Sequence, residues 1–416
     1  MTQPAASRRS LRALDALAFL APDIQGGVGP FLVVFMAGTL AWNPQRIGTV
    51  MFVSALVGLA VQAPAGALID SVRHKPRWIA GAIALIAASL VVMVNRPGYA
   101  VILAGQSLIG AAGALVAPAI AATSLGMVGR VGFDARVGRN TAITATGTVL
   151  WALGTGWIGH AFGPHAMFFF AAAMALPTIA AALCIRRRDI DPQLARGADA
   201  EATPTARPVR WHDRRLFVLL ACAFLFHLAN AAMLTLVAQK VGAQAGTSMA
   251  LWLSWGVIVT QLVTIPIGLA VGRWAPRLPR KPIFLVGFAV LPVRGLLYVL
   301  ADSPAALLAL QLLDGLGAGI FGVMLTLMIS DLTRGSGHFN FALGLGATCV
   351  GLGAALSNLL GGAVAHAAGY GTAFSVLAGI AAAALALFAL AMPETRGQAH
   401  PPADAPAASA LISAAP

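Results

Sequence analysis

The 416-residue chain is 59% apolar, only 10% charged, and has a formal net charge of +13. No water-soluble fold can bury so large an apolar fraction, so the composition indicates a protein whose solvent is lipid. The positive charge would also fit a nucleic-acid-binding protein. However, the basic residues form short clusters between long apolar stretches, without interleaved aromatic side chains, and this argues against nucleic acid as a partner.

Stretches of about 20 mostly apolar residues are long enough to cross the hydrocarbon core of a bilayer as helices. The first stretch follows a pair of arginines, as an export signal does. Because Asp23 and Gln25 interrupt it and no cleavage site follows, we expect it to remain as the first helix. The sequence predicts twelve such spans, at 14–38, 47–69, 78–95, 100–127, 140–162, 166–185, 216–238, 250–271, 283–300, 305–329, 340–363 and 371–391.

The distribution of basic residues predicts the orientation of these spans. Of the 27 Lys and Arg residues, 23 fall on the side of the N-terminus, three on the opposite side, and Arg294 lies inside a span. Lys and Arg are retained in the cytoplasm, so we expect both termini there and the chain in the bacterial inner (plasma) membrane.

A long polar segment divides the spans into six and six, as a linker between two bundles would. The predicted fold class is therefore an all-α integral membrane protein with twelve transmembrane helices in two six-helix bundles. The predicted parts are a cytoplasmic tail at 1–13, a bundle at 14–185, a cytoplasmic linker at 186–215, a bundle at 216–391 and a disordered cytoplasmic tail at 392–416.

The two predicted bundles are repeats of each other. Four short matches occur in the same order at offsets of 200 to 206 residues: Gly66 with Gly268, Gln106 with Gln311, Asn140 with Asn340, and His160 with His366. Two pseudo-symmetric halves can rock about a site at their interface, which is how secondary transporters expose a site to each side in turn.

The turn after the second span reads Gly66-Ala-Leu-Ile-Asp70-Ser71-Val-Arg73-His-Lys75. This resembles the signature of the major facilitator superfamily, bacterial type, with Ser71 and Arg73 departing from the usual residues. The resemblance implies that Gly66, Asp70, Arg73 and Lys75 form a cytoplasmic gate in which Asp70 caps or pairs with a neighbouring helix end. The equivalent turn of the second half has Gly in place of the Asp.

The resemblance does not assign a subfamily. Gln106 stands where proton-coupled drug antiporters carry an Arg, and the fifth span has their glycines without the proline. The segment Pro393-Glu394-Thr395-Arg396-Gly397 is similar to the ending of sugar porters, but the seventh span lacks their glutamine pair.

Ionisable side chains within a span cost at least about 2.5 kcal/mol and therefore indicate function. Asp23 and Gln25 precede a Gly/Pro-rich stretch that we expect to bend the first span towards a central cavity. Asp23 is the candidate proton carrier, or alternatively satisfies the backbone of the bent helix. The repeat places His227 opposite Gln25, and Asn230 lies one turn further along, so both are candidates for the cavity. His227 can also be a hydrogen-bonded structural group.

Asp314 and Arg294 lie at similar depth, either as a buried ion pair or as a cation contact tuned by Arg294. Gln106 and Gln311 contact either the substrate or neighbouring helices. Asn140 and Asn340, at the predicted starts of two spans, are expected to cap them.

Three functions remain open. The first is a secondary transporter for a small organic solute, coupled to protons and favouring export. The second is a proton-coupled uptake symporter for a sugar or organic ion. The third is a receptor or membrane-embedded enzyme, and the spans lack the convergent set of groups that an enzyme needs. We expect a monomer without metal or cofactor that is not an enzyme.

Overall fold

The computed structural model of the chain describes residues 6–26, 32, 35–42, 44–198, 213–245 and 249–396. These residues form helices because a helix satisfies every backbone polar group within itself, as a lipid solvent demands. The first half contains α1 (Arg8–Gly26), a π-helical turn (Phe35–Thr39), α3 (Pro44–Ser71), α4 (Lys75–Asn95), α5 (Tyr99–Phe162) and α6 (Pro164–Cys184).

Two short 3-10 turns, η2 (Arg187–Asp189) and η3 (Leu194–Arg196), follow α6. The second half contains α7 (Arg214–Ala245), α8 (Met249–Trp274), α9 (Arg280–Leu300), α10 (Pro304–Ala309), α11 (Gln311–Leu332) and α12 (Phe339–Ala391).

The predicted twelve crossings agree with these helices. Within the described part of the chain, nine helical stretches are long and apolar enough to cross a membrane. Two of them, in α5 and α12, are double crossings, broken at Gly129 (φ 64°) and Gly369 (φ 83°). Such a φ is readily adopted only by glycine. The first predicted span completes the set, and part of it lies outside the described residues.

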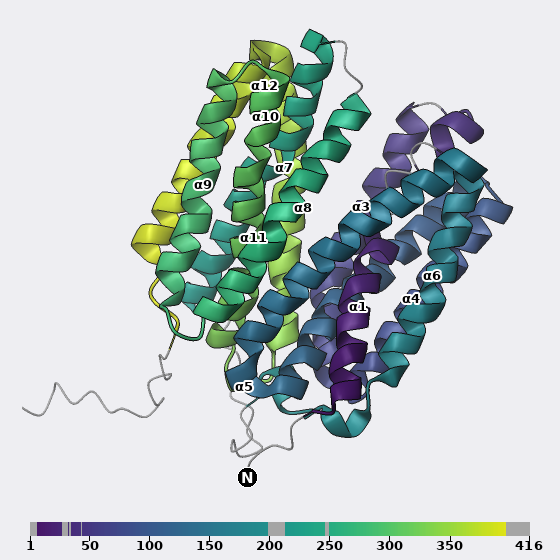
Figure 1. The fold of residues 1–416 in the computed structure, drawn as a ribbon, viewed down its shortest axis with the longest axis vertical. Coiled ribbons are helices and arrows are strands. Elements are labelled where there is room, and N and C mark those ends of the chain that lie inside the picture. The colour runs from purple at the N-terminus through teal and green to yellow at the C-terminus, as the bar shows by residue number, and fades with distance from the viewer. Residues whose placement is uncertain are drawn as a thin grey trace, which may run out of the picture.

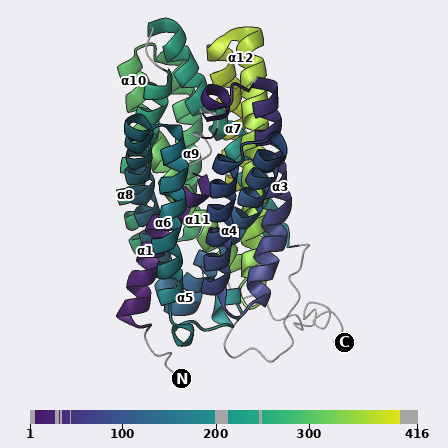
Figure 2. The same ribbon diagram turned by 90° about the vertical axis from the view of Figure 1, so that its right-hand side faces the viewer.

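Figure 1 shows the two halves of the chain as bundles side by side, the first purple to teal and the second teal-green to yellow. They approach each other at the end where α1 begins, and their ribbons splay apart towards the other end. In the perpendicular view of Figure 2 the helices run along the long axis of the molecule. We call the end that carries η2 and η3 the linker end.

Each bundle has its own core, and apolar side chains also cover the outer surface. Phe35, Ile86 and Phe168 are fully or almost fully buried in the first bundle, whereas Phe52 and Leu176 are 68% and 71% exposed. A soluble protein rarely exposes so many large apolar side chains, but a lipid-facing surface does. The packing therefore fits a multi-pass membrane protein.

Close helix contacts repeat between the halves. A Cβ atom on Gly147 would lie 2.3 Å from the carbonyl oxygen of Phe19, and one on Gly353 would lie 2.4 Å from that of Phe224. The glycines are 206 residues apart and the phenylalanines 205, so the sequence repeat is also a repeat of packing.

Several predicted boundaries differ from the structure. Helix α1 begins at Arg8, before the predicted span at 14–38. Residues 130–139 are helical because α5 resumes directly after Gly129. The linker is partly packed: Ala195 is fully buried, and the backbone N–H of Asp191 donates to Gly126 O at 2.9 Å. The prediction of a disordered tail from residue 392 is wrong for residues 392–396, which pack against α9. Residues 199–212 and 397–416 lie outside the described residues.

Candidate functional site

The carboxylate of Asp70, at the end of α3, lies at the start of α12 in the other half. It accepts hydrogen bonds from Phe341 N at 2.9 Å, Asn340 N at 3.2 Å and Asn340 Nδ2 at 2.8 Å. The first N–H groups of a helix have no partner within the helix and carry its positive dipole end, so a carboxylate there is doubly favourable. Asp70 thus makes the contact with a neighbouring helix end that the resemblance implied.

Gly66, one turn before Asp70, permits this approach. A Cβ atom at Gly66 would lie only 2.1 Å from Asn340 O. Lys75 is buried at the start of α4 and its ammonium donates to Val72 O at 3.1 Å, which closes the turn between α3 and α4. Arg73 is exposed on the same turn.

The expected capping roles of the two asparagines are wrong. Asn340 does not cap α12, because Asp70 supplies the acceptor and the Asn340 side chain donates to Asp70 and to Ala195 O at 3.0 Å. Asn140 lies inside α5 and donates to Ser124 Oγ at 2.9 Å. Asn140 thus joins the two crossings of α5, and Asn340 joins α12 to α3 and the linker. A local sequence pattern cannot show such pairing.

The pseudo-symmetric contact between α5 and α8 is built differently. Gly272 stands where Asp70 stands in the first half, and a Cβ atom on it would lie 2.9 Å from the Cα of Gly138. A Cβ atom on Gly138 would in turn lie 2.4 Å from Gly268 O. At this position the two halves are in contact through the backbone atoms of glycines.

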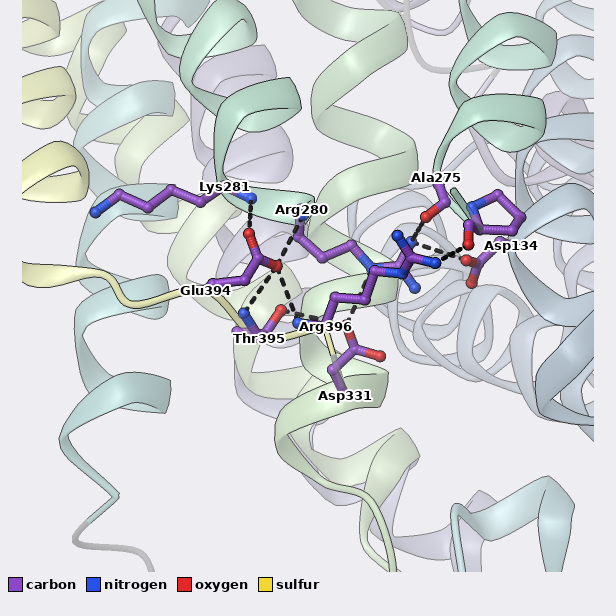
Figure 3. Close-up of polar contacts among 9 residues, drawn as sticks. Asp134, Ala275, Arg280, Lys281, Asp331, Glu394, Thr395 and Arg396 are labelled. Atoms are coloured by element: carbon purple, nitrogen blue, oxygen red, sulfur yellow. Dashed lines mark hydrogen bonds and ion pairs between the residues drawn. The ribbon is translucent and has the colours of Figure 1, made fainter. Parts of the chain in front are cut away.

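An ionic cluster flanks this contact at the linker end (Figure 3). The guanidinium of Arg280, at the start of α9, contacts Asp134 of α5 at 2.8 Å and Asp331 of α11 at 3.1 Å. It also donates to Ala275 O at 2.8 Å. Arg280 therefore joins the first half to two elements of the second, with all three charged side chains mostly buried.

Glu394 completes the cluster by capping α9. Its carboxylate accepts from Arg280 N at 2.8 Å and Lys281 N at 3.0 Å, as Figure 3 shows. Burial alone would raise the pKa of Glu394, but hydrogen bonds from the N–H groups of Arg396, Lys281, Arg280 and Thr395 outweigh it, and the pKa is lowered. Thr395 Oγ1 donates to Asp331 Oδ2 at 3.2 Å, which ties the end of the chain to the same cluster.

The first part of the linker crosses the interface between the halves. Gly197 O accepts from Arg130 Nη2 of α5 and from Gly335 N of the second half, each at 2.8 Å. Ala195 O receives the Asn340 side chain described above. This segment therefore adds to the contact between the halves at the linker end.

A second polar network lies within the second half. Arg294 of α9 forms an ion pair with Asp314 of α11 and donates to Asn230 Oδ1 of α7. Thr260 of α8 donates to Asp314 Oδ2 at 3.1 Å, so four helices meet at this pair. The side chains of Arg294 and Asp314 are only 3% and 16% exposed. The geometry is that of a buried ion pair, the first of the two interpretations offered by the sequence.

The remaining candidates are distributed over both halves. His227 Nδ1 lies 3.3 Å from Ala223 O, and its ring packs edge-on against Phe321. Gln311 Nε2 donates to Tyr298 Oη at 2.6 Å, and Gln106 is buried in α5. The side chains of Asp23 and Gln25 lie outside the described residues.

Sequence reasoning missed Asp134, Arg280, Asp331 and Glu394. Only 14 acidic residues occur in the chain, and Asp331 and Glu394 closely follow predicted spans on the side of the N-terminus, where Asp134 lies between two others. The position of these acidic residues on one side of the membrane was the available signal. It does not stand out, because polar residues are common at the ends of spans.

Comparison with known proteins agrees with this architecture. The family described as Major Facilitator Superfamily matches residues 14–291 and 219–415. An uncharacterized MFS-type transporter of Mycobacterium tuberculosis, found in strains CDC 1551 and H37Rv, is 40% identical over 392 residues, covering 93% of this chain and 94% of the relative.

Solved structures share the fold at low sequence identity. The MFS transporter FucP in its outward conformation has a TM-score of 0.72 and 14% identity, covering 92% of this chain and 98% of its own. The proton:xylose symporter XylE has a TM-score of 0.72 and 12% identity, covering 94% and 96%. The human organic anion transporter MFSD10 has a TM-score of 0.65 and 16% identity, covering 90% and 96%.

The fold and the interface thus define a two-bundle membrane transporter. The chain belongs to the major facilitator superfamily.

Proposed function

We propose that this chain is a secondary active transporter that moves a small organic solute by alternating access, coupled to protons, with export as the favoured direction. The observation that carries the proposal is the asymmetric closure of the interface. The Asp70 cap, the Gly138–Gly272 contact and the Arg280 cluster all join the halves at the linker end, and the ribbons splay apart at the other end (Figure 1).

The distribution of basic residues supports a linker end that faces the cytoplasm. We propose that both termini lie on that side and that the chain resides in the inner membrane. In that orientation the structure is the outward-facing state, closed towards the cytoplasm. FucP, which resembles it, was solved in an outward conformation. We propose that the chain acts as a monomer, since each half finds its partner within the same chain.

The contacts that close the linker end are of the kind that can break and re-form. Each is a polar or glycine-mediated contact between two packed helices, and the helix cap is worth roughly 0.3–2 kcal/mol. A few such contacts give a closed state that a solute or a proton can shift by a comparable free energy.

We propose Asp23 as the proton carrier, with Gln25 and Asn230 beside the path of the solute and Gln106 and Gln311 on helices that pack around that path. The support comes from Asp314, the other carboxylate predicted within a span: it is paired with Arg294 and Thr260, which leaves Asp23 as the candidate acid. His227, whose ring packs against Phe226 and Phe321, is the second candidate for the proton carrier.

The test is solute flux in proteoliposomes with an imposed pH gradient and a panel of labelled cations, anions and sugars. The expected result is flux that depends on the gradient, abolished by Asp23→Asn and retained by the exposed control Asp302→Asn. Flux of a transported solute that responds neither to the gradient nor to Asp23→Asn contradicts proton coupling.

The second candidate function is proton-coupled uptake of a sugar or organic ion. One observation favours it: the Pro393-Glu394-Thr395-Arg396 segment, which is similar to the ending of sugar porters, is packed at the interface cluster. Accumulation of a sugar against its gradient, driven by an inward proton gradient, would establish uptake as the direction. A receptor or membrane-embedded enzyme would give no flux in either direction.

A further inference from the structure

A cavity of about 560 Å³ lies at the linker end of the first bundle, apart from the interface between the halves. The turn between α3 and α4 and the start of α4 form one wall, and the end of α6 and the segment that follows it form the other. Its lining includes Arg73, His74, Arg77, Arg186, Arg187 and Arg188. Two stretches more than a hundred residues apart in sequence thus bring five guanidinium groups to one hollow.

The positive charge of this cavity is largely uncompensated. Within the described part of the chain, none of the five guanidinium groups forms an ion pair or a side-chain hydrogen bond. Asp189, the acidic side chain beside them, accepts hydrogen bonds from the hydroxyl groups of Ser7 and Ser10. Asp189 can balance at most one of the five charges.

The pKa of His74, which also lines the cavity, reflects this excess of positive charge. Desolvation, together with the charges of Arg187, Arg77 and Arg73, lowers the pKa of His74. A fixed cluster of like charges costs free energy unless a counter-ion is bound, so the fold keeps a site that favours an anion.

The cavity also adjoins the lipid-facing surface. Leu183, near the end of α6, and Ile185, just after it, form part of its lining, and Leu183 is 57% exposed. Trp78, next to Arg77 on α4, is 42% exposed, and tryptophan is enriched at the boundary between lipid and water. Guanidinium groups bind phosphate through paired hydrogen bonds. Basic pockets between transmembrane helices hold the phosphate of lipid headgroups.

We propose that this cavity binds a phosphate ester, namely the headgroup of an anionic phospholipid in the adjacent leaflet. A free phosphate ion shares the same chemistry and is the alternative source. The site does not depend on which solute is transported. Because Arg73 belongs to the turn that also carries Asp70, a bound headgroup would hold this turn in its closed position.

The experiment measures lipid retention by native mass spectrometry on purified full-length protein in detergent, with phosphatidylglycerol, phosphatidylcholine or inorganic phosphate added. The test variant is Arg77→Gln/Arg187→Gln, which removes two exposed charges from opposite walls. The matched control is Arg273→Gln/Arg277→Gln, which removes two exposed charges from the end of α8 and the turn after it in the second half. Size-exclusion profiles check that all three proteins fold.

The expected result is preferential retention of one phosphatidylglycerol by the wild type and the control, reduced at least fivefold in the test variant and weakened by salt. Binding of inorganic phosphate with the same dependence on Arg77 and Arg187, together with equal retention of the two lipids, would support the anion site and assign it to a soluble phosphate. Equal retention of both lipids without such phosphate binding, or equal losses in the test and control variants, would overturn the proposal.

Discussion

Asp70 of α3 and Asn340 of α12 are 270 residues apart in the chain, yet the carboxylate of Asp70 accepts both the backbone N–H and the side-chain N–H of Asn340. The pair joins the end of the second crossing to the start of the eleventh. Because the two residues belong to different halves, any motion that opens the linker end must break it.

Asp70→Asn keeps the size of the side chain but removes its charge and one acceptor. Loss of a charged cap costs roughly 0.5–2 kcal/mol, so the ratio of closed to open molecules should fall by about 2- to 30-fold. Spin labels at Ser71 and His338, in a variant without the native cysteines, measure the distance across the linker end. Asp302→Asn, at the opposite end, should leave that distance distribution unchanged. An unaltered distribution in Asp70→Asn would show that the cap does not hold the closed state.

Gly66→Ala tests the same contact through shape rather than charge. The added Cβ would meet the carbonyl oxygen of Asn340 at 2.1 Å, and backbone cannot move aside as a flexible side chain does. Overpacking costs about 1–3 kcal/mol, so the closed state should be depopulated. Gly81→Ala is the control, since no atom lies within 4 Å of its added Cβ. The spin-label distance across the linker end reports both variants, and a wild-type distribution for Gly66→Ala would contradict the close approach.

The sequence was sufficient to predict the fold because a segment that crosses lipid must be both apolar and helical, so each apolar stretch indicates a helix. Twelve apolar stretches and four ordered matches predicted two bundles, and the repeat is also seen in equivalent close contacts at Gly147 and Gly353, which are not among those matches. The helix breaks at Gly129 and Gly369 were harder to predict, since glycine is common throughout the spans. Helix ends were misplaced at Arg8 and after Gly129, where polar residues continue a helix out of the apolar region.

The candidate site was predictable only where a residue stands out locally. Asp70 follows a signature, and Arg294 and Asp314 are charges in apolar stretches. Arg280 and Glu394 looked like ordinary residues at span ends, and their importance comes from partners 51 to 146 residues away. Local pattern carries no information about such pairing.

Arg280→Gln should weaken the closed interface more than Asp134→Asn. Arg280 pairs with both Asp134 and Asp331, so its removal takes the shared cationic partner from two mostly buried carboxylates. Breaking a buried pair from one side costs about 3–5 kcal/mol, whereas Asp134→Asn leaves Arg280 paired with Asp331. Thermal unfolding and spin-label distances on both single variants and the double variant form a mutant cycle. Additive effects of the two substitutions would mean that the two side chains do not interact.

Glu394→Gln should lower stability at neutral pH, with a difference from wild type that shrinks on acidification. The folded-state pKa of Glu394 lies below its ordinary value of 4.5, because four backbone N–H groups favour the carboxylate. A depressed pKa contributes stability above the unfolded-state pKa, and that contribution is lost as the pH falls through the folded-state pKa. Melting temperatures of both proteins across pH 7 to about pH 3.5 measure it. A difference that is constant over this range would contradict a role for the charge of Glu394.

The pair of Arg294 and Asp314 separates a structural role from a transport role. Asp314→Asn leaves a guanidinium that is almost fully buried facing a neutral amide, and should cost about 3–5 kcal/mol of stability. The double variant Arg294→Gln/Asp314→Asn removes both charges, so it should be more stable than Asp314→Asn alone, with Asn230 and Thr260 still available to the new amides. Melting temperatures of the two single variants and the double variant check this. Proteoliposome flux of the double variant then distinguishes the roles: retained flux fits an ion pair that only holds four helices together. Recovered stability without any flux would mean that Asp314 contacts the transported solute or its coupling ion.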